Sequence, residues 1–133
     1  MRFFLLIFLI LVTKVHADQV YKCKCIQNNI FMNNKISRPN CENNYASIKI
    51  KVGWFKESIT VNDGSIWLSS ATNYEDAIFT EDSIIWNSCK GDDCLKKVHR
   101  NSIDFDRNGL FLKTTQHYPD SVIQKRYMCF DSK

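Results

Sequence analysis

Two histidines could carry acid–base chemistry in the body of this chain, His99 and His117. A secreted ribonuclease can use two imidazoles and a lysine as general acid, general base and phosphate-binding cation. We expect each histidine to lie in a polar loop, and no spacing in the sequence brings the two together. A hydrolase that acts through His99 and His117 is therefore the alternative function, and no residue is assigned as catalytic.

A calcium-loop pattern occurs once in the sequence. Residues 104–109 (DFDRNG) match the first six positions of an EF-hand loop. The twelfth position is Thr115, which lacks the bidentate carboxylate that completes calcium coordination. We predict a β-hairpin whose tip uses Asn108 and Gly109 for positive φ, with a loop-bound calcium ion as the alternative. No metal site and no cofactor are predicted.

The cysteines favour disulfide chemistry. An even number of cysteines in a short exported chain predicts disulfides formed in an oxidising compartment. Cys89 and Cys94 bracket a turn-forming KGDD segment, so we expect them to bond to each other. Cys23 and Cys25 lie on one strand face about 6.6 Å apart, so we expect each to bond to a different partner. The sequence leaves open which of the two bonds to Cys41 and which to Cys129. The six are Cys23, Cys25, Cys41, Cys89, Cys94 and Cys129. Thiolate coordination of zinc is the alternative.

One short aromatic segment is the predicted binding site. Gly53 follows an alternating strand and can turn the chain out of the sheet, so that Trp54, Phe55 and Lys56 project from a loop. An apolar pair beside positive charge suits an acidic partner, either an extracellular protein or an anionic glycan. The alternative is that one ring packs back over the core.

The elements that must position these residues are strands. Apolar residues recur at every second position, and Asn, Asp and Gly mark the turns between them. We expect loop over residues 27–44 and at most one helical turn, over 73–77. The pattern predicts an all-β fold, a small antiparallel barrel or sandwich of about eight strands held by disulfides. The predicted strands are 20–27, 45–52, 58–61, 66–68, 76–80, 83–87, 102–106, 110–115 and 122–130.

The N-terminus has the pattern of a secretory signal peptide. Arg2 precedes the apolar residues 3–12, and the small-x-small pattern of residues 15–17 (VHA) follows. We predict a signal peptide over 1–17, an uncleaved anchor being the alternative, and one domain over 18–133. Removal of residues 1–17 takes away the two positive charges of Arg2 and Lys14, so the formal net charge falls from +4 to +2. A charge this close to balance predicts no nucleic-acid partner. We also expect no further membrane span, a monomer, and a secreted or periplasmic location.

The C-terminal residues resemble a recurring ending of small exported bacterial proteins. In that ending a strand runs into Asp-Arg-x-x-Gly, as in SIDFDRNGLFL here with one residue fewer, and a last strand carries a cysteine, as in RYMCF. The Tyr21-x-Cys23 opening and the cysteine of the last strand are also similar to periplasmic inhibitors of c-type lysozyme. These resemblances imply an exported β protein and lend no binding residue. We predict a non-enzymatic binding protein of unknown ligand, such as an inhibitor of a lysozyme-like or other extracellular enzyme.

Overall fold

The computed structural model describes residues 18–52, 57–62, 72–74, 77–89, 93–96 and 99–132. The predicted signal peptide, residues 1–17, lies outside this part of the chain. So do the predicted binding residues Trp54, Phe55 and Lys56, which remain a prediction. No helix in the described ranges is long and apolar enough to cross a membrane.

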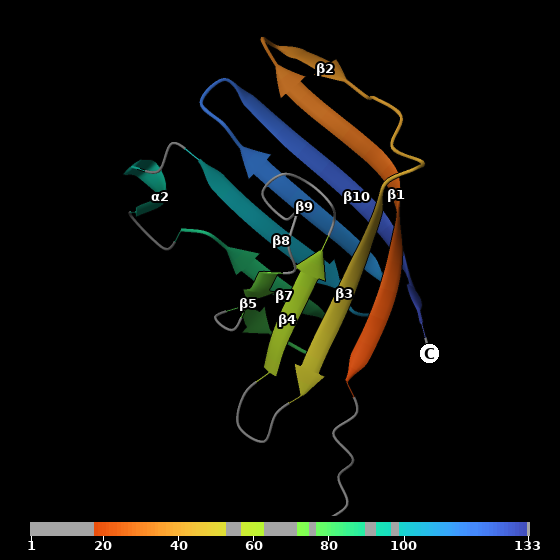
Figure 1. Cartoon of the computed structure of the whole chain (residues 1–133). Helices are drawn as coiled ribbons and strands as arrows, with labels where there is room; N and C mark the ends of the chain where they lie inside the picture. The colour runs from red at the N-terminus through yellow and green to blue at the C-terminus, as the bar shows by residue number, and fades with distance from the viewer. Residues whose placement is uncertain are drawn as a thin grey trace, which may run out of the picture.

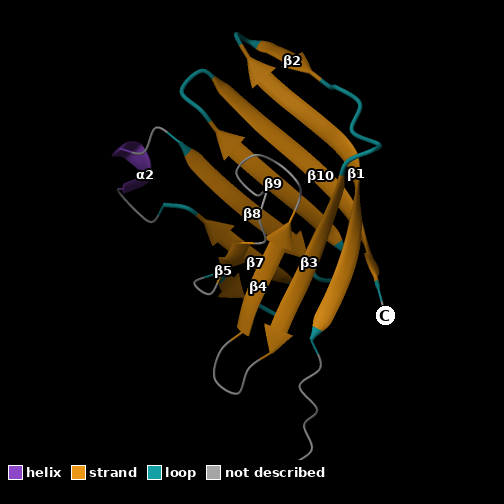
Figure 2. Cartoon of the chain, in the orientation of Figure 1, coloured by secondary structure: helices purple, strands orange, loops and turns teal. Residues whose placement is uncertain are grey.

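The described chain is almost entirely β-structure, which confirms the predicted fold class (Figure 2). The longest strands are those at the two ends of the domain, and one short helix lies between the seventh and eighth strands. The strands are β1 (Gln19–Met32), β2 (Lys35–Ser37), β3 (Tyr45–Val52), β4 (Glu57–Asn62), β5 (Thr72–Tyr74), β6 (Ile78–Phe79), β7 (Ser83–Asn87), β8 (Arg100–Asp106), β9 (Phe111–His117) and β10 (Ser121–Asp131), and the helix is α2 (Asp93–Lys96).

All these strands belong to one antiparallel sheet that curls on itself, with β3 and β4 folding over β7 and β8 (Figure 1). The order is β5-β4-β3-β1-β10-β9-β8-β7-β6, and β2 pairs with β1. Alternate residues of each strand point to the inside, where Ile48, Ile59, Ile103 and Leu112 are fully or almost fully buried. Burial of one face explains the period of two in the sequence. The result is a barrel-like sheet, and no pairing between β5 and β6 closes it within the described residues.

The expected loop over residues 27–44 is wrong in its first part. Strand β1 continues to Met32, and Lys35–Ser37 returns beside it as β2. The two-residue turn between them is Asn33 and Asn34, with φ of 52° and 60°. Positive φ at both central residues is the geometry that matches strand twist in a tight hairpin, and asparagine tolerates it better than most residues. The asparagines therefore make a turn between strands, where composition alone suggested a loop.

The segment 73–77, where we expected at most one helical turn, is strand in its first two residues. Residues Thr72–Tyr74 form β5 and pair with β4. The strand expected at 66–68 lies outside the described residues. The one described helix, α2, follows Cys89 and contains Cys94.

The three disulfides are Cys23–Cys129, Cys25–Cys41 and Cys89–Cys94, and no described cysteine is free. Cys89 bonds to Cys94 as the spacing predicts. Cys23 and Cys25 bond to different partners, and the structure fixes the order that the sequence left open. Cys23 and Cys129 are directly opposite each other on the paired strands β1 and β10. Three disulfides indicate an oxidising compartment.

Residues 107–110 form the predicted hairpin between β8 and β9, but not by the predicted geometry. Leu110, with φ of 56°, takes the positive φ that we assigned to Asn108 and Gly109. Asp106 Oδ1 accepts hydrogen bonds from the backbone N–H groups of Asn108 and Gly109, at 2.9 and 3.0 Å. A Cβ on Gly109 would lie 2.9 Å from Asp106 Oδ2, so the small residue at this position leaves room for the carboxylate.

Candidate binding face

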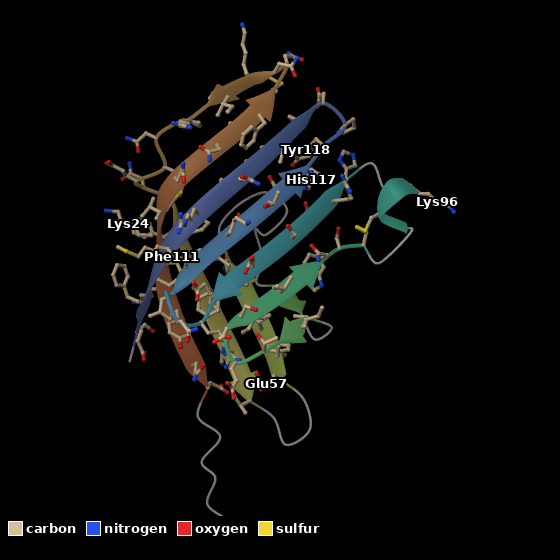
Figure 3. The ribbon with its side chains drawn as sticks, turned by 180° about the vertical axis from the view of Figure 1, so that it is seen from behind. Lys24, Glu57, Lys96, Phe111, His117 and Tyr118 are labelled. Atoms are coloured by element: carbon tan, nitrogen blue, oxygen red, sulfur yellow. A yellow bond between two sulfur atoms is a disulfide. The ribbon has the colours of Figure 1, made fainter. Side chains whose placement is uncertain are left out.

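An unusual row of side chains crosses the outer face of four adjacent strands. The register places Tyr45 of β3 opposite Lys24 of β1, Lys24 opposite Met128 of β10, and Met128 opposite Phe111 of β9. Lys22 and Phe130 form the next outward pair on β1 and β10. We call these six residues the stapled face: Lys22, Lys24, Tyr45, Phe111, Met128 and Phe130. Figure 3 shows Lys24 and Phe111 close together on this side of the molecule.

Three of the four apolar members of the stapled face are open to solvent, and the fourth, Phe111, is half-buried. The exposed fractions are 63% for Tyr45, 50% for Phe130 and 39% for Met128. Single exposed apolar residues are common on protein surfaces, whereas neighbouring ones that share a face mark interaction sites. Lys22 and Lys24 lie among them, and neither forms an ion pair with a described carboxylate. The face is therefore apolar and positively charged.

Two disulfides lie directly under this face. Cys23 and Cys25 alternate with Lys22 and Lys24 along β1 and point to the buried side, where Cys23 bonds to Cys129 between Met128 and Phe130. Cys25 bonds to Cys41, and its backbone N–H donates to Asn44 O at 3.0 Å, just before Tyr45. Covalent links on both sides of β1 hold these outward side chains on a rigid support. A rigid surface loses less conformational entropy when it binds.

A groove of about 520 Å³ adjoins the stapled face beside the Cys25–Cys41 disulfide. It lies where β1 has a register irregularity between Cys25 and Gln27, which leaves Ile26 without a partner in β10. The exposed fraction of Ile26 is 49%. Ile26, Pro39 and Met128 supply apolar lining, and Lys24 and Arg38 supply positive charge. The groove thus extends the apolar and cationic character of the face.

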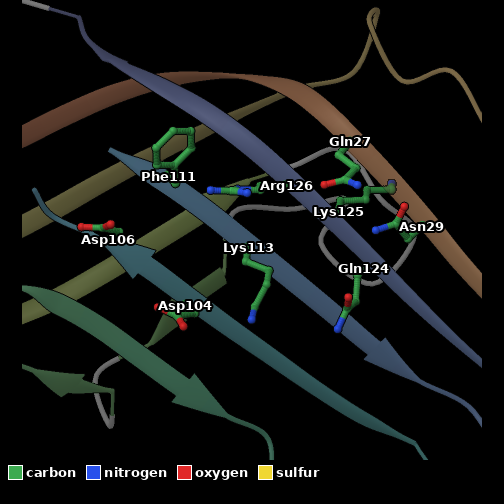
Figure 4. Close-up of a pocket in the computed structure, with 9 residues that line it drawn as sticks. All are labelled: Gln27, Asn29, Asp104, Asp106, Phe111, Lys113, Gln124, Lys125 and Arg126. Atoms are coloured by element: carbon green, nitrogen blue, oxygen red, sulfur yellow. The ribbon is translucent and has the colours of Figure 1, made fainter. Parts of the chain in front are cut away.

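A second groove, of about 340 Å³, lies on the same outer surface over β1, β10, β9 and β8 (Figure 4). Its lining contains three cations (Lys113, Lys125 and Arg126), three amides (Gln27, Asn29 and Gln124), two carboxylates (Asp104 and Asp106) and the ring of Phe111. We call it the polar groove. It shares Phe111 with the stapled face but is otherwise polar.

The two histidines lie nearer to each other than the sequence implied. His117 is the last residue of β9, not a loop residue, and it pairs with Arg100 of β8. His99 precedes Arg100, and its ring meets the ring of Tyr118 edge-on at 5.5 Å between centroids. Burial, and then the Arg100 guanidinium, lower the pKa of His117 below 6.5. The stapled-face groove and the polar groove are lined by other residues, so neither imidazole faces these cavities.

The calcium-loop residues do not converge. Asp104 points outward from β8 into the polar groove, and Asp106 Oδ1 is engaged by the hairpin turn. Among the described residues no three His, Cys, Asp or Glu side chains form a group that could hold a metal ion.

The sequence contained one signal for the stapled face. Tyr127, Met128, Cys129 and Phe130 are four consecutive nonpolar residues in the last strand. A half-buried strand needs only every second one of them for the core. Comparison with protein-family models, curated proteins and solved structures finds no match.

Proposed function

We propose that this protein is an exported, non-enzymatic binding protein that docks the acidic surface of an extracellular protein through the stapled face. The observation that carries the proposal is the cross-strand row of Tyr45, Lys24, Met128 and Phe111 above two disulfides. Exposed aromatic and methionine side chains on a rigid support are typical anchors of protein interfaces. An inhibitor of an extracellular enzyme is one form that such a protein takes.

The charge of the face favours an acidic partner over a second copy of this chain. A two-fold symmetric dimer places the same patch on both subunits, so Lys22 and Lys24 would face their own like charges. Arg38 and Arg126 add positive charge at the margins, and Glu42 is the carboxylate that lines the adjoining groove. An acidic surface compensates these cations, and electrostatic attraction speeds its association.

The geometry supports binding more than the hydrolase alternative. His99 precedes Arg100, and Arg100 is paired with His117 across β8 and β9, so both histidines lie at one corner of the sheet. A hydrolase needs its acid and base beside a site that holds the substrate. The cavities over the outer face have no histidine in their lining.

Immobilised mature protein tests the proposal by capturing partners from extracellular fluid, with each captured protein identified and then purified. The purified partner is titrated against wild type and against a Tyr45→Ser/Phe130→Ser variant. Both side chains are exposed, so the variant should fold. We expect at least tenfold weaker binding by the variant, and weaker binding of wild type at high salt. The matched control is Ile36→Ser, which removes a side chain that is 56% exposed on β2, and it should bind as wild type does.

Three outcomes would overturn the proposal. The first is unchanged affinity of the Tyr45→Ser/Phe130→Ser variant for the identified partner. The second is a wild-type dimer in sedimentation analysis that the same variant dissociates, because the face would then be occupied by a second copy. The third is binding to anionic phospholipid vesicles that the variant loses, with no protein partner captured.

A further inference from the structure

The polar groove contains charge that the protein itself does not neutralise. Lys113, Lys125 and Arg126 line it, and none forms an ion pair with a described carboxylate. Lys113 is even directly opposite Asp104 in the register without pairing with it. The guanidinium carbon of Arg126 lies 4.6 Å from the centroid of the Phe111 ring, which holds this cation in place by a cation–π contact. The groove thus presents three cations against two carboxylates, Asp104 and Asp106, and one of the cations, Arg126, is held in place.

Asn29 adds an uncompensated polar group to the same groove. Its Oδ1 atom is buried and has no hydrogen-bond partner. A buried polar atom without a partner destabilises a folded protein, and native structures contain few of them. Asn29 lines the groove together with the amides of Gln27 and Gln124. Because this oxygen is shielded from solvent, the groove wall offers a ligand the other two amides, Gln27 and Gln124.

The opposite wall of the groove is acidic. Asp104 and Asp106 lie on β8, across the groove from Gln27 and Asn29 of β1 (Figure 4). Two carboxylates repel a densely charged polyanion such as a polyphosphate. They accept hydrogen bonds from hydroxyl groups, and such charge-assisted bonds are stronger than neutral ones. The groove therefore suits a ligand with one anionic group and several hydroxyls.

We propose that the polar groove binds an acidic saccharide, one with a uronate-type carboxylate and free hydroxyl groups. The carboxylate pairs with Arg126 and Lys113, while ring hydroxyls donate to Asp104 and to the side-chain amide oxygens of Gln27 and Gln124. The volume of about 340 Å³ is within the range of small-molecule sites, about 300–1,000 Å³. This site is distinct from the stapled face, with which it shares only Phe111, although Arg126 lies at the margin between them.

Titration calorimetry of the mature protein with tri-galacturonate tests the site, with the methyl-esterified trisaccharide and sodium sulfate as parallel probes. We expect saturable binding of tri-galacturonate, at least tenfold weaker binding of the neutral ester, and no comparable binding of sulfate. Equal binding of ester and acid would overturn the role of the cations. Sulfate binding as tight as that of the trisaccharide would reduce the groove to a simple anion site, and absence of any saccharide binding would also overturn the proposal.

Arg126→Met should weaken binding of the acid and leave binding of the neutral ester unchanged. Lys22→Met is the matched control, because it removes a cation of the stapled face and should leave saccharide binding intact.

Discussion

The rings of Tyr21 and Phe105 lie 5.4 Å apart, centroid to centroid, with their planes tilted by 50°. Tyr21 is on β1 and Phe105 on β8, and β10 and β9 separate these strands in the sheet. Neighbouring strands are about 4.8 Å apart, so in a flat sheet the two would be about 14 Å apart. The contact shows that the sheet curls until inward side chains of distant strands meet. This curl turns the six residues of the stapled face outward.

Phe105→Ala should lower the free energy of unfolding by about 3–5 kcal/mol, because it empties a fully buried aromatic position between the two halves of the sheet. Tyr45→Ala removes a larger aromatic side chain from the outer face, and it should change the free energy of unfolding by less than about 0.5 kcal/mol. Urea denaturation measures both. Similar losses from the two substitutions would mean that Tyr45 serves the core and not a surface.

Much of this arrangement could be predicted from sequence, for a physical reason. Strands such as β3 and β8 bury one face, so alternation reports them directly. The β1–β2 hairpin was missed because its asparagines suggest loop composition, although Asn33 and Asn34 adopt the positive φ that a tight turn requires.

The stapled face was missed for a different reason. Met128 and Phe130 are nonpolar and lie beside Tyr127 and Cys129, which are buried, so sequence alone suggests that all four are core residues. Only the pairing of β10 with β1 and β9 shows which two point outward and which cations lie beside them. Both cations of this face lie on β1, and its other two aromatic residues lie on β3 and β9, so no local window of sequence contains the whole face.

The disulfides should differ in their effect on stability according to the loop that each closes. The sequence separations are 106 for Cys23–Cys129, 16 for Cys25–Cys41 and 5 for Cys89–Cys94. The chain-entropy relation then predicts losses of about 5, 3 and 2 kcal/mol when each pair is replaced by alanine. Urea denaturation of the three double variants gives the order. A larger loss for Cys89/Cys94 than for Cys23/Cys129 would contradict it.

His117 should titrate below 6.5, because burial and the Arg100 guanidinium both disfavour its charged form and lower its pKa. The unfolded chain then binds the proton more tightly, so stability from this group is complete above about pH 6.5 and is lost as the pH falls through the folded-state pKa. NMR titration of the imidazole measures this pKa. Arg100→Gln should raise it and Arg38→Gln should not. Titration of His117 above 6.5 would contradict the account.

Millimolar calcium should leave the melting temperature unchanged. Asp106 Oδ1 already accepts two backbone hydrogen bonds in the hairpin turn, and Asp104 faces the polar groove. A calcium site at 100-fold excess over its dissociation constant would add about 2.7 kcal/mol, which thermal denaturation detects. An upward shift that Asp104→Ala abolishes would restore the calcium hypothesis for residues 104–109.

Oxidative footprinting of the two exposed methionines tests the docking face most directly. Met128 lies in the stapled face with an exposed fraction of 39%, and Met32 lies at the β1–β2 turn with 49%. Oxidant reaches both thioethers in the free protein. When the purified partner is bound, the oxidation rate of Met128 should fall at least fivefold, and the oxidation rate of Met32 should stay unchanged. Protection of Met32 with continued oxidation of Met128 would place the partner elsewhere and contradict the proposed function.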